Sequence, residues 1–229
     1  MDEVLRVRGL KVRYGVVAAV RGIDFSLGRG EVLAIAGANG AGKSSTVMSI
    51  VAGTENAVTE GSIRYRGQEL VGLAAERISS LGIACVPEGR RIFSGLTVME
   101  NLLLGAAVPR RHPDFEPALR EVFTTFPILE EFRRRPAGLL SGGQLQQLAL
   151  GRAMIRRPEL MVIDEPSIGL SPNLVSEILA HIAALRDSGT AILLVDQNAE
   201  RAKALADRWM VIDKGRIREC SWDAAKEVG

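Results

Sequence analysis

The stretch Gly37–Ser44, which reads GANGAGKS, constrains this chain more than any other. Its fixed positions match G-x-x-x-x-G-K-[ST], the phosphate-binding loop. The apolar run Val32–Ala36 before it predicts a buried strand, and Ser45–Ala52 after it predicts a helix that Gly53 is suited to end. Glycines in such a loop let backbone N–H groups surround an anion, and the helix N-terminus adds partial positive charge. A glycine-rich turn that binds nothing is the weaker alternative.

This motif assigns chemistry to individual residues. Lys43 is expected to reach the β- and γ-phosphates of a nucleotide, and the Ser44 hydroxyl is expected to bind Mg²⁺. The other loop residues expected to contact the nucleotide are Gly37, Asn39, Gly40, Ala41, Gly42 and Ser45. The motif therefore predicts the phosphates of a nucleotide and Mg²⁺ as ligands.

Apolar runs and helical patterns alternate along much of the chain, which predicts an α/β fold with a mostly parallel sheet. Expected strands after the loop helix lie at 83–86, 160–163, 191–195 and 209–212. Expected helices lie at 74–81, 98–104, 117–126, 144–155, 174–185 and 200–206, with a hairpin turn at 214–215 and a short tail helix after it. The N-terminal runs alternate in polarity between glycine turns, which is typical of antiparallel strands.

These patterns predict one domain over residues 1–229. Residues 1–87 and 159–229 are expected to form an α/β core with an N-terminal antiparallel β subdomain. Residues 88–158, where helical patterns dominate, are expected to form an inserted helical subdomain. Helices are expected on both faces of the parallel sheet.

Composition excludes several classes of protein. No stretch reaches the roughly 18–20 apolar residues of a membrane span, and the first residues lack a basic-then-apolar signal segment. We therefore expect the chain to act at a membrane only through a partner. A net charge of +2 and an aromatic content of 4% give no footprint of a nucleic-acid-binding protein. Cys85 and Cys220, which are far apart in the sequence, are expected to be reduced.

A second apolar strand, Leu160–Ile163, ends in two carboxylates. Parallel sheets bind ligands at the carboxyl ends of their strands. Asp164 is therefore expected in the Mg²⁺ shell, and Glu165 is expected to polarise a water for attack on the γ-phosphate. An Asp-Glu pair alone is more often a strand-end turn, but together with the phosphate loop it becomes a strong signal.

The stretch Leu140–Gln144, which reads LSGGQ, precedes a helical pattern. Ser141 is expected to cap this helix, and Gly142 and Gly143 expose its N-terminal N–H groups. The arrangement predicts a second anion site, separate from the first. A plain helix cap is the alternative, which the order of the three motifs disfavours.

With these motifs in this order, the chain resembles the nucleotide-binding subunits of ABC transporters over its whole length. Gly37–Ser44 matches Walker A, Leu140–Gln144 the signature, and Leu160–Glu165 Walker B with its catalytic glutamate. The resemblance implies that two ATPase domains pack head to tail, with ATP between one phosphate loop and the partner's signature (Ser141, Gly142, Gly143 and Gln144). It also implies that Tyr14 stacks on adenine, the alternative being a Tyr14 that faces the core.

Three residues depart from the commonest family pattern. Glu88 stands where glutamine is usual, Gln197 where histidine is usual, and Ser171 where aspartate is usual. Glu88 can still bind Mg²⁺ or water, Gln197 can donate to a phosphate without carrying charge, and Ser171 makes a weaker link across a dimer. A degraded, inactive ATPase is the alternative, which the intact loop and carboxylate pair oppose. The expected catalytic residues are Glu165, Lys43, Gln197 and Glu88, and the expected metal ligands are Ser44, Asp164 and Glu88.

Glu88 and Gln197 also narrow the resemblance to one branch of the ABC ATPases. With PEGRRIF at 87–93 and LLVDQNA at 193–199, they resemble the shorter ATPase of branched-chain amino-acid importers, although that branch more often carries glutamate at Gln144. The resemblance implies ATP hydrolysis that energises uptake of branched-chain or related amino acids, by a peripheral protein at the cytoplasmic face of the plasma membrane. Implied partners are a second, paralogous ATPase subunit, transmembrane permease subunits and, indirectly, a solute-binding protein, with no nucleic acid. Import of urea, amides or another solute, export or lipid transport, and a non-transport ABC ATPase remain alternatives.

The same resemblance places a groove for a cytoplasmic helix of the permease along Glu88–Gly105. Phe93 and Leu96 would give apolar contact, with Arg90 and Arg91 as a polar rim. An equally strong alternative is that these residues only pack within the chain or face solvent and bind no partner.

Overall fold

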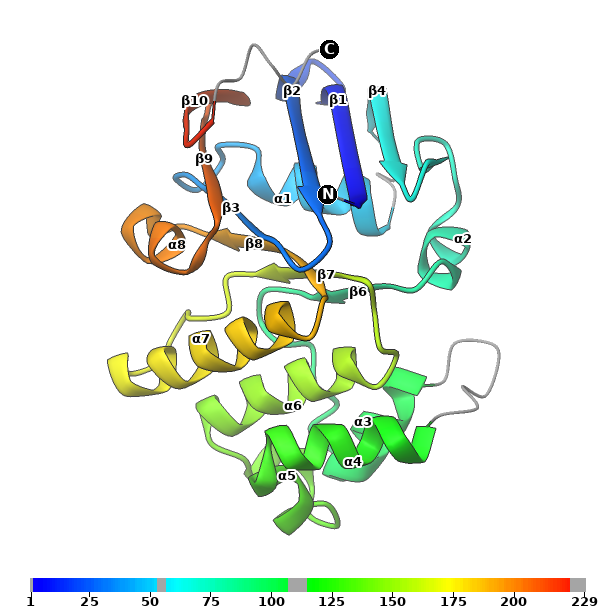
Figure 1. Cartoon of the computed structure of the whole chain (residues 1–229), viewed down its shortest axis with the longest axis vertical. Coiled ribbons are helices and arrows are strands. Elements are labelled where there is room, and N and C mark those ends of the chain that lie inside the picture. Colours follow the sequence, from blue (N-terminus) through cyan, green and yellow to red (C-terminus); the bar gives the residue numbers. More distant parts are fainter. Residues whose placement is uncertain (1, 53–56, 107–114, 223–229) are drawn as a thin grey trace.

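Two β-sheets and a group of helices are stacked along the long axis of the molecule (Figure 1). The computed structural model describes residues 2–52, 57–106 and 115–222. Figure 1 shows an antiparallel sheet at the top, a parallel sheet in the middle and most of the helices below. The expected fold class is confirmed.

The antiparallel sheet has the strand order β2-β1-β4-β5. Its strands are β1 (Glu3–Tyr14), β2 (Val17–Gly28), β4 (Val58–Tyr65) and β5 (Gln68–Glu69). Along β1, Leu5 and Val7 are buried while Arg8 is exposed, because successive side chains point to opposite faces of a strand. One face of this sheet therefore packs on the core and the other meets solvent.

The central sheet has the order β10-β9-β3-β8-β7-β6. Its strands are β3 (Val32–Ala36), β6 (Ile83–Val86), β7 (Leu160–Asp164), β8 (Ala191–Asp196), β9 (Arg208–Asp213) and β10 (Arg216–Cys220). All pairs are parallel except β9 with β10. Every residue of β3 and β8 is buried, because both faces of the sheet are covered. That burial explains why these strands read as unbroken apolar runs.

Alternate residues of β7 pack into two different cores on the two faces of the central sheet. Leu160 and Val162 pack with the antiparallel sheet, α1 (Lys43–Val51) and α2 (Ala75–Ser80). Met161 and Ile163 pack with the helices on the other face. Those helices are α3 (Val98–Ala106), α4 (Phe115–Thr125), α5 (Pro127–Glu131), α6 (Gly142–Met154) and α7 (Pro172–Asp187). A smaller cluster holds α8 (Ala199–Leu205) against β3.

The differences from the sequence expectations are local. Helix α5 and strand β5 are too short to show a clear period, so the sequence did not reveal them. After the turn at Lys214-Gly215 the chain forms β10 rather than entering a helix directly, because Arg216–Cys220 pairs back along β9. Residues 223–229, which include the rest of the expected tail helix, and Gly53, the expected helix stop, lie outside the described residues.

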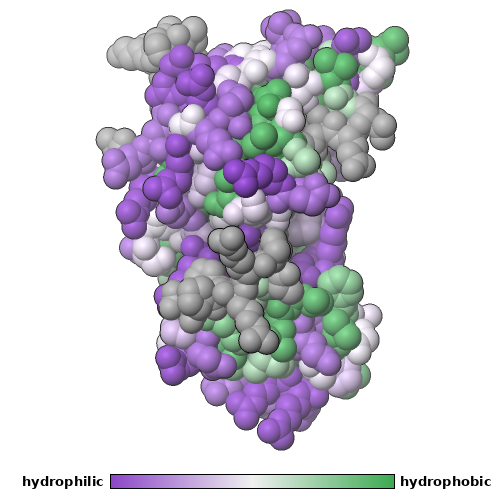
Figure 2. Space-filling view, turned by 90° about the vertical axis from the view of Figure 1, so that its right-hand side faces the viewer, coloured by the Kyte–Doolittle hydropathy of each residue, from purple (hydrophilic) through white to green (hydrophobic). Residues whose placement is uncertain are grey.

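In the described part of the chain, no helix is long and apolar enough to cross a bilayer. The face in Figure 2 is mostly hydrophilic. Its apolar patches lie in the lower half, at the level of α3 and α4, and higher up at the level of the antiparallel sheet. Exposed apolar side chains of the helical part include Phe93, Leu103, Leu104 and Leu139.

Candidate functional site

The carboxyl ends of the parallel strands bring the predicted motifs to one edge of the central sheet. The register pairs Ala36 with Asp196 and Asp164 with Val195, so β3, β7 and β8 end at the same level. Strand β6 ends beside β7, where Val86 pairs with Ile163. The loops after these four strands therefore open at one place, as expected for a ligand site in a parallel sheet.

A cavity of about 430 Å³, here called the P-loop cavity, lies at this edge. The predicted site residues that line it are Tyr14, Asn39, Gly40, Gly42, Lys43, Ser44, Ser45, Glu88, Glu165 and Gln197. Ala19 and Ile168 also line it and were not predicted. Tyr14 is 38% exposed at the end of β1, so the alternative that it faces the core is wrong.

Two glycines of the loop are needed for close approach. A Cβ at Gly37 would lie 2.4 Å from the carbonyl oxygen of Ile212, and one at Gly42 would lie 2.5 Å from that of Ala19. Gly42 also has a φ of 112°, which side chains disfavour. Ala41 is buried and does not line the cavity; its carbonyl accepts a hydrogen bond of 2.8 Å from the Gly215 N–H. The loop is thus fixed against the backbones of β2, β9 and the β9–β10 turn.

Lys43 lies across the loop. Its Nζ donates to the carbonyl oxygens of Gly37 at 2.7 Å and Ala38 at 3.3 Å. The same Nζ is 3.5 Å from Glu165 Oε1, and both side chains are buried, 5% and 8% exposed. Burial makes this ion pair stronger than a surface pair, because water screens it less. The cationic end of Lys43 is therefore held between the phosphate loop and the carboxylate at the end of β7.

Three carboxylates concentrate negative charge beside the loop. Burial raises the pKa of Asp164 to about 6, the charges of Glu165 and Glu88 add to the rise, and Lys43 opposes it. Within the described residues, no group of three or more His, Cys, Asp or Glu side chains could bind a metal alone. Mg²⁺ typically uses one or two carboxylates together with phosphate oxygens. Asp164 and the exposed hydroxyl of Ser44 fit that mode of binding.

Glu165 has an unusual backbone. Its φ is 49°, in the left-handed region that few non-glycine residues adopt. Its N–H donates to the Val195 carbonyl at 2.8 Å, which ties the start of this loop to β8. Such strain persists only where surrounding contacts enforce it, and it is common at functional sites.

The segment Pro87–Phe93 is fixed from two sides. Arg152 of α6 donates to the carbonyl oxygens of Arg91 at 2.8 Å and Arg90 at 3.2 Å. The buried Asn101 accepts a bond of 3.0 Å from the Phe93 N–H, and its amide donates to the Phe93 carbonyl at 3.0 Å. The sequence reasoning missed the roles of Arg152 and Asn101.

Arg90, which the resemblance places on the polar rim of a permease groove, makes two hydrogen bonds within the chain. Its Nε donates to Gln146 Oε1 at 3.1 Å, and its Nη2 donates to the Ile168 carbonyl at 3.3 Å. Phe93 is 56% exposed although its backbone is pinned by Asn101, so an apolar ring is presented on a fixed loop. Arg90 instead links this loop to helix α6 and to the loop after β7.

The signature begins α6 with a capping box, as the Ser141 cap predicted. Ser141 Oγ accepts from the Gln144 N–H at 3.3 Å, and Gln144 Oε1 accepts from the Ser141 N–H at 2.8 Å. Gly143 packs so closely that a Cβ would lie 2.8 Å from the Leu174 side chain. Ser141 and Gln144 line a separate cavity of about 360 Å³. None of the four signature residues lines the P-loop cavity.

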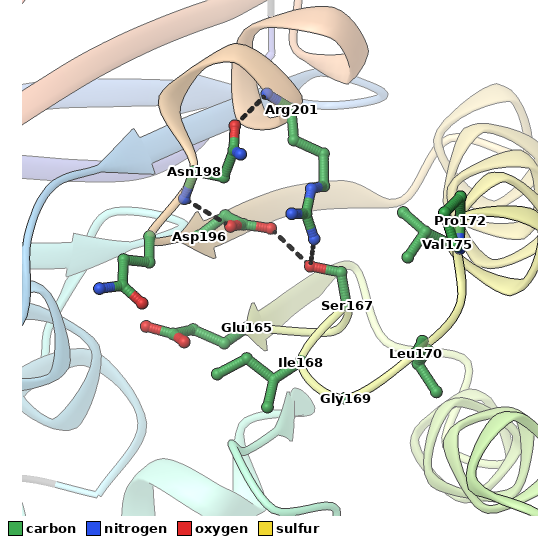
Figure 3. A pocket seen from close by; sticks show the side chains of 11 residues that line it. Glu165, Ser167, Ile168, Gly169, Leu170, Pro172, Val175, Asp196, Asn198 and Arg201 are labelled. Carbon is green, nitrogen blue, oxygen red and sulfur yellow. Dashed lines mark hydrogen bonds between the residues drawn. The ribbon is translucent and has the colours of Figure 1, made fainter.

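A larger cavity of about 670 Å³, here called the Ser167 cavity, adjoins the P-loop cavity (Figure 3). Glu165, Ile168 and Gln197 line both cavities. The Ser167 cavity is otherwise built from the loop after β7, the start of α7 and the start of α8.

Comparisons with known proteins agree with this geometry. A family model described as ABC transporter matches residues 20–168. The high-affinity branched-chain amino acid transport ATP-binding protein BraG of Pseudomonas aeruginosa is 44% identical over 204 residues, which cover 89% of this chain and 86% of BraG. The probable branched-chain amino acid transport ATP-binding protein LivF of Archaeoglobus fulgidus is 33% identical, covering 93% of this chain and 90% of LivF. A crystal structure of an ATP-binding cassette in its ADP conformation is 25% identical with a TM-score of 0.86, covering 100% of this chain and 94% of the other.

Proposed function

Because this chain belongs to the ATP-binding subunits of ABC transporters, we propose that it hydrolyses ATP to energise import of branched-chain or related amino acids. The observation that carries the proposal is the convergence of Lys43, Glu165 and Gln197 on one cavity at the carboxyl edge of the sheet. The similarity to BraG supports the choice of solute. We further take residues 1–229 as one ATPase domain, with residues 88–158 as its helical subdomain.

Nucleotide binding would use Tyr14 and the phosphate loop, which line the same cavity. Tyr14 offers an exposed aromatic ring for adenine, and the N–H groups of the loop would surround the phosphates. Lys43 would exchange its carbonyl partners for phosphate oxygens, which form stronger, charge-assisted bonds. Bound Mg²⁺, held by Ser44 and Asp164 with Glu88 nearby, would neutralise charge on the phosphates.

Hydrolysis needs a proton acceptor and a donor near the γ-phosphate. Glu165 is the base, because its carboxylate lines the cavity beside Lys43 and can take a proton from the attacking water. Once Lys43 engages phosphate, the Glu165 carboxylate loses its ion-pair partner and can accept a hydrogen bond from the attacking water. The Gln197 amide can donate a hydrogen bond to a γ-phosphate oxygen from the opposite loop.

The position of the signature supports a second ATPase subunit as partner. Ser141 and Gln144 line their own cavity, away from the phosphate loop of the same chain. The N-terminus of α6 carries partial positive charge, which suits the phosphates of a nucleotide bound to another subunit. A closed site would therefore combine Lys43 of one subunit with the signature of the other. The second subunit would be a paralogous ATPase chain.

Contact with a permease would use the exposed apolar side chains of the helical part. Phe93 lies on the loop that Asn101 holds, and Leu103 and Leu104 are exposed in the turn of α3 that follows Asn101. A cytoplasmic permease helix placed here would bring the chain to the inner face of the membrane as a peripheral subunit. A solute-binding protein would act on the permease and so only indirectly on this chain.

The test is co-purification of the tagged chain with membrane subunits, followed by reconstitution in proteoliposomes with the solute-binding protein. ATP turnover is measured with leucine, isoleucine or valine, and with urea and acetamide as alternative solutes. A complex carrying Lys43→Ala is the control for contaminating ATPases. Stimulation by the branched-chain amino acids is expected. Stimulation by urea alone would refute branched-chain amino acids as the solute. A chain that hydrolyses no ATP and co-purifies with no membrane subunit would refute its assignment as a transporter ATPase.

A further inference from the structure

Asp196 is a buried carboxylate at the end of β8 that directly precedes Gln197. It is 5% exposed, and both of its oxygens are engaged. Oδ1 accepts a hydrogen bond of 2.7 Å from the Asn198 N–H, which closes a tight turn around Gln197. Oδ2 accepts a hydrogen bond of 3.0 Å from the Ser167 hydroxyl. The carboxylate therefore shapes the loop that carries Gln197 and reaches across to the loop after β7.

Ser167 connects this carboxylate to a cation. Its hydroxyl, in a side chain that is 5% exposed, donates to Asp196 and accepts from Arg201 Nη1. Figure 3 shows Ser167 between the two charged side chains. A hydroxyl has one proton to donate and two lone pairs, so it makes both bonds at once. The directions are fixed, since a carboxylate only accepts and a guanidinium only donates.

Arg201 is itself held in place by the start of α8. Its backbone N–H donates to Asn198 Oδ1 at 2.9 Å, which caps the helix. The network thus closes on itself: Asn198 bonds to Asp196 and Arg201, and Ser167 bonds to the same two residues. A closed network of charge-assisted bonds holds its members more rigidly than separate pairs.

Two predicted catalytic residues lie close to members of this network in the sequence. Ser167 follows Glu165 by two residues, and Asp196 immediately precedes Gln197. Glu165 and Gln197 line both the P-loop cavity and the Ser167 cavity. The Ser167–Asp196 hydrogen bond therefore links the loop that carries Glu165 to the loop that carries Gln197. The distance between the two loops sets the distance between these two side chains.

We propose that Ser167 and Arg201 are positioning residues for ATP hydrolysis, which hold the Glu165 loop and the Gln197 loop at the separation that the reaction requires. The inference rests on the proposed ATPase function. It assigns them no direct contact with ATP: neither lines the P-loop cavity, which holds Lys43 and the phosphate loop. Loss of the network should therefore slow turnover and leave nucleotide affinity intact.

The test compares Ser167→Ala and Arg201→Ala with the wild type in the purified transporter complex. Misplacement of a reacting group by about 1 Å can cost on the order of 100-fold in rate. We expect kcat to fall about 10- to 100-fold in Ser167→Ala and about tenfold in Arg201→Ala, with the Kd for ATP within about threefold of wild type. The double variant should be no slower than Ser167→Ala, because the Arg201 side chain acts only through the Ser167 hydroxyl.

Conservative variants separate positioning from folding. Ser167→Thr keeps the hydroxyl, and the cavity beside Ser167 leaves room for the methyl group, so it should restore most of kcat. Arg201→Lys keeps the positive charge and should restore part of kcat. Lys203→Ala is the matched control on the same helix, because Lys203 Nζ lies 4.0 Å over the Trp209 ring, away from Ser167. Its kcat should be unchanged.

The outcomes are distinct. If the wild-type complex hydrolyses no ATP, the proposed function fails. If the wild type is active and both alanine variants keep kcat within twofold, or if their effects multiply in the double variant, the positioning role is wrong. Loss of ATP binding or a lowered melting temperature that accounts for the lost turnover would make the network structural, and would likewise overturn the proposal.

Discussion

The Lys43 ammonium lies 3.5 Å from the Glu165 carboxylate, and the pair joins the phosphate loop to the end of β7. The two residues are 122 positions apart in the sequence, yet each is nearly inaccessible to solvent. This pair connects the residue that would hold the phosphates with the residue that would activate water. Binding and chemistry can therefore be separated by changing one partner at a time.

Glu165→Gln should remove the base and keep the shape of the side chain. Turnover should fall by about 10²- to 10⁴-fold, the usual contribution of a general base. ATP affinity should be retained, because the change leaves Lys43 and the phosphate loop, which would bind the phosphates, intact. Phosphate release and ATP titration measure the two effects. Glu159→Gln, an exposed change at the opposite end of β7, is the control, and near-normal phosphate release by Glu165→Gln would exclude this base.

Lys43→Ala should instead abolish tight ATP binding. A charge-assisted contact to phosphate contributes about 2–3 kcal/mol, so the Kd should rise by at least about 30-fold. Calorimetric titration with ATP measures the change. Lys11→Ala removes an exposed lysine of β1 that pairs with Glu60, and its affinity should match the wild type. An unchanged Kd in Lys43→Ala would contradict the role of the loop.

Arg152→Lys should loosen the segment Pro87–Phe93. Lysine keeps the charge, but it lacks the planar fork that reaches the Arg90 and Arg91 carbonyls together. Unfolding free energy should fall by about 1–2 kcal/mol, and amide exchange in residues 87–93 should accelerate. Hydrogen exchange with mass spectrometry locates the change. The exposed Arg120→Lys should alter neither quantity, and unchanged exchange in Arg152→Lys would rule out the clamp.

The capping box should show a measurable coupling. Ser141→Ala removes the acceptor for the Gln144 N–H and should cost about 1 kcal/mol in stability, with a similar loss for Gln144→Ala. Because the two bonds are reciprocal, the double variant should lose less than the sum of the single losses. Denaturant unfolding of all four proteins gives the coupling energy. Strict additivity would mean that the two bonds form independently.

Glu69 predicts a dependence of stability on pH. Burial alone would raise the pKa of Glu69, but hydrogen bonds from Ser62, Ile63 and Val71 outweigh it and hold the pKa below its ordinary value. A lowered folded-state pKa stabilises the fold above the unfolded-state pKa, and the gain is lost as pH falls through the folded-state pKa.

Glu69→Gln should therefore be less stable than the wild type at pH 7, by about 1 kcal/mol because the site is partly exposed. The difference should shrink steadily as pH is lowered below about 4.5, the ordinary pKa of a glutamate. Urea unfolding at several pH values measures it. Glu76→Gln, on the exposed side of α2, is the control. A difference that grows at low pH would contradict the sign of the shift.

The sequence alone determined the parts of this protein that have local signals. Gly37–Ser44 predicted the phosphate loop between β3 and α1, because the motif and its flanking periods lie within twenty residues. Apolar runs predicted β3, β6, β7 and β8, because a strand that is buried on both faces carries apolar residues at nearly every position. Ser141 predicted its helix cap, because a capping box spans only four residues.

Only the tertiary structure decided how separate segments meet. Arg152 contacts a carbonyl 61 residues away, and Arg201 contacts a hydroxyl 34 residues away. No local period or spacing marks such pairs, because the sheet order and the loop paths place them. The same reason explains Tyr14. Its place in the polar–apolar alternation of β1 was compatible with a side chain in the core, but the β1–β2 hairpin places it at the P-loop cavity. The sequence revealed the motifs of the predicted site, while the meeting of Glu165 and Gln197 at one cavity follows from the packing of β7 beside β8.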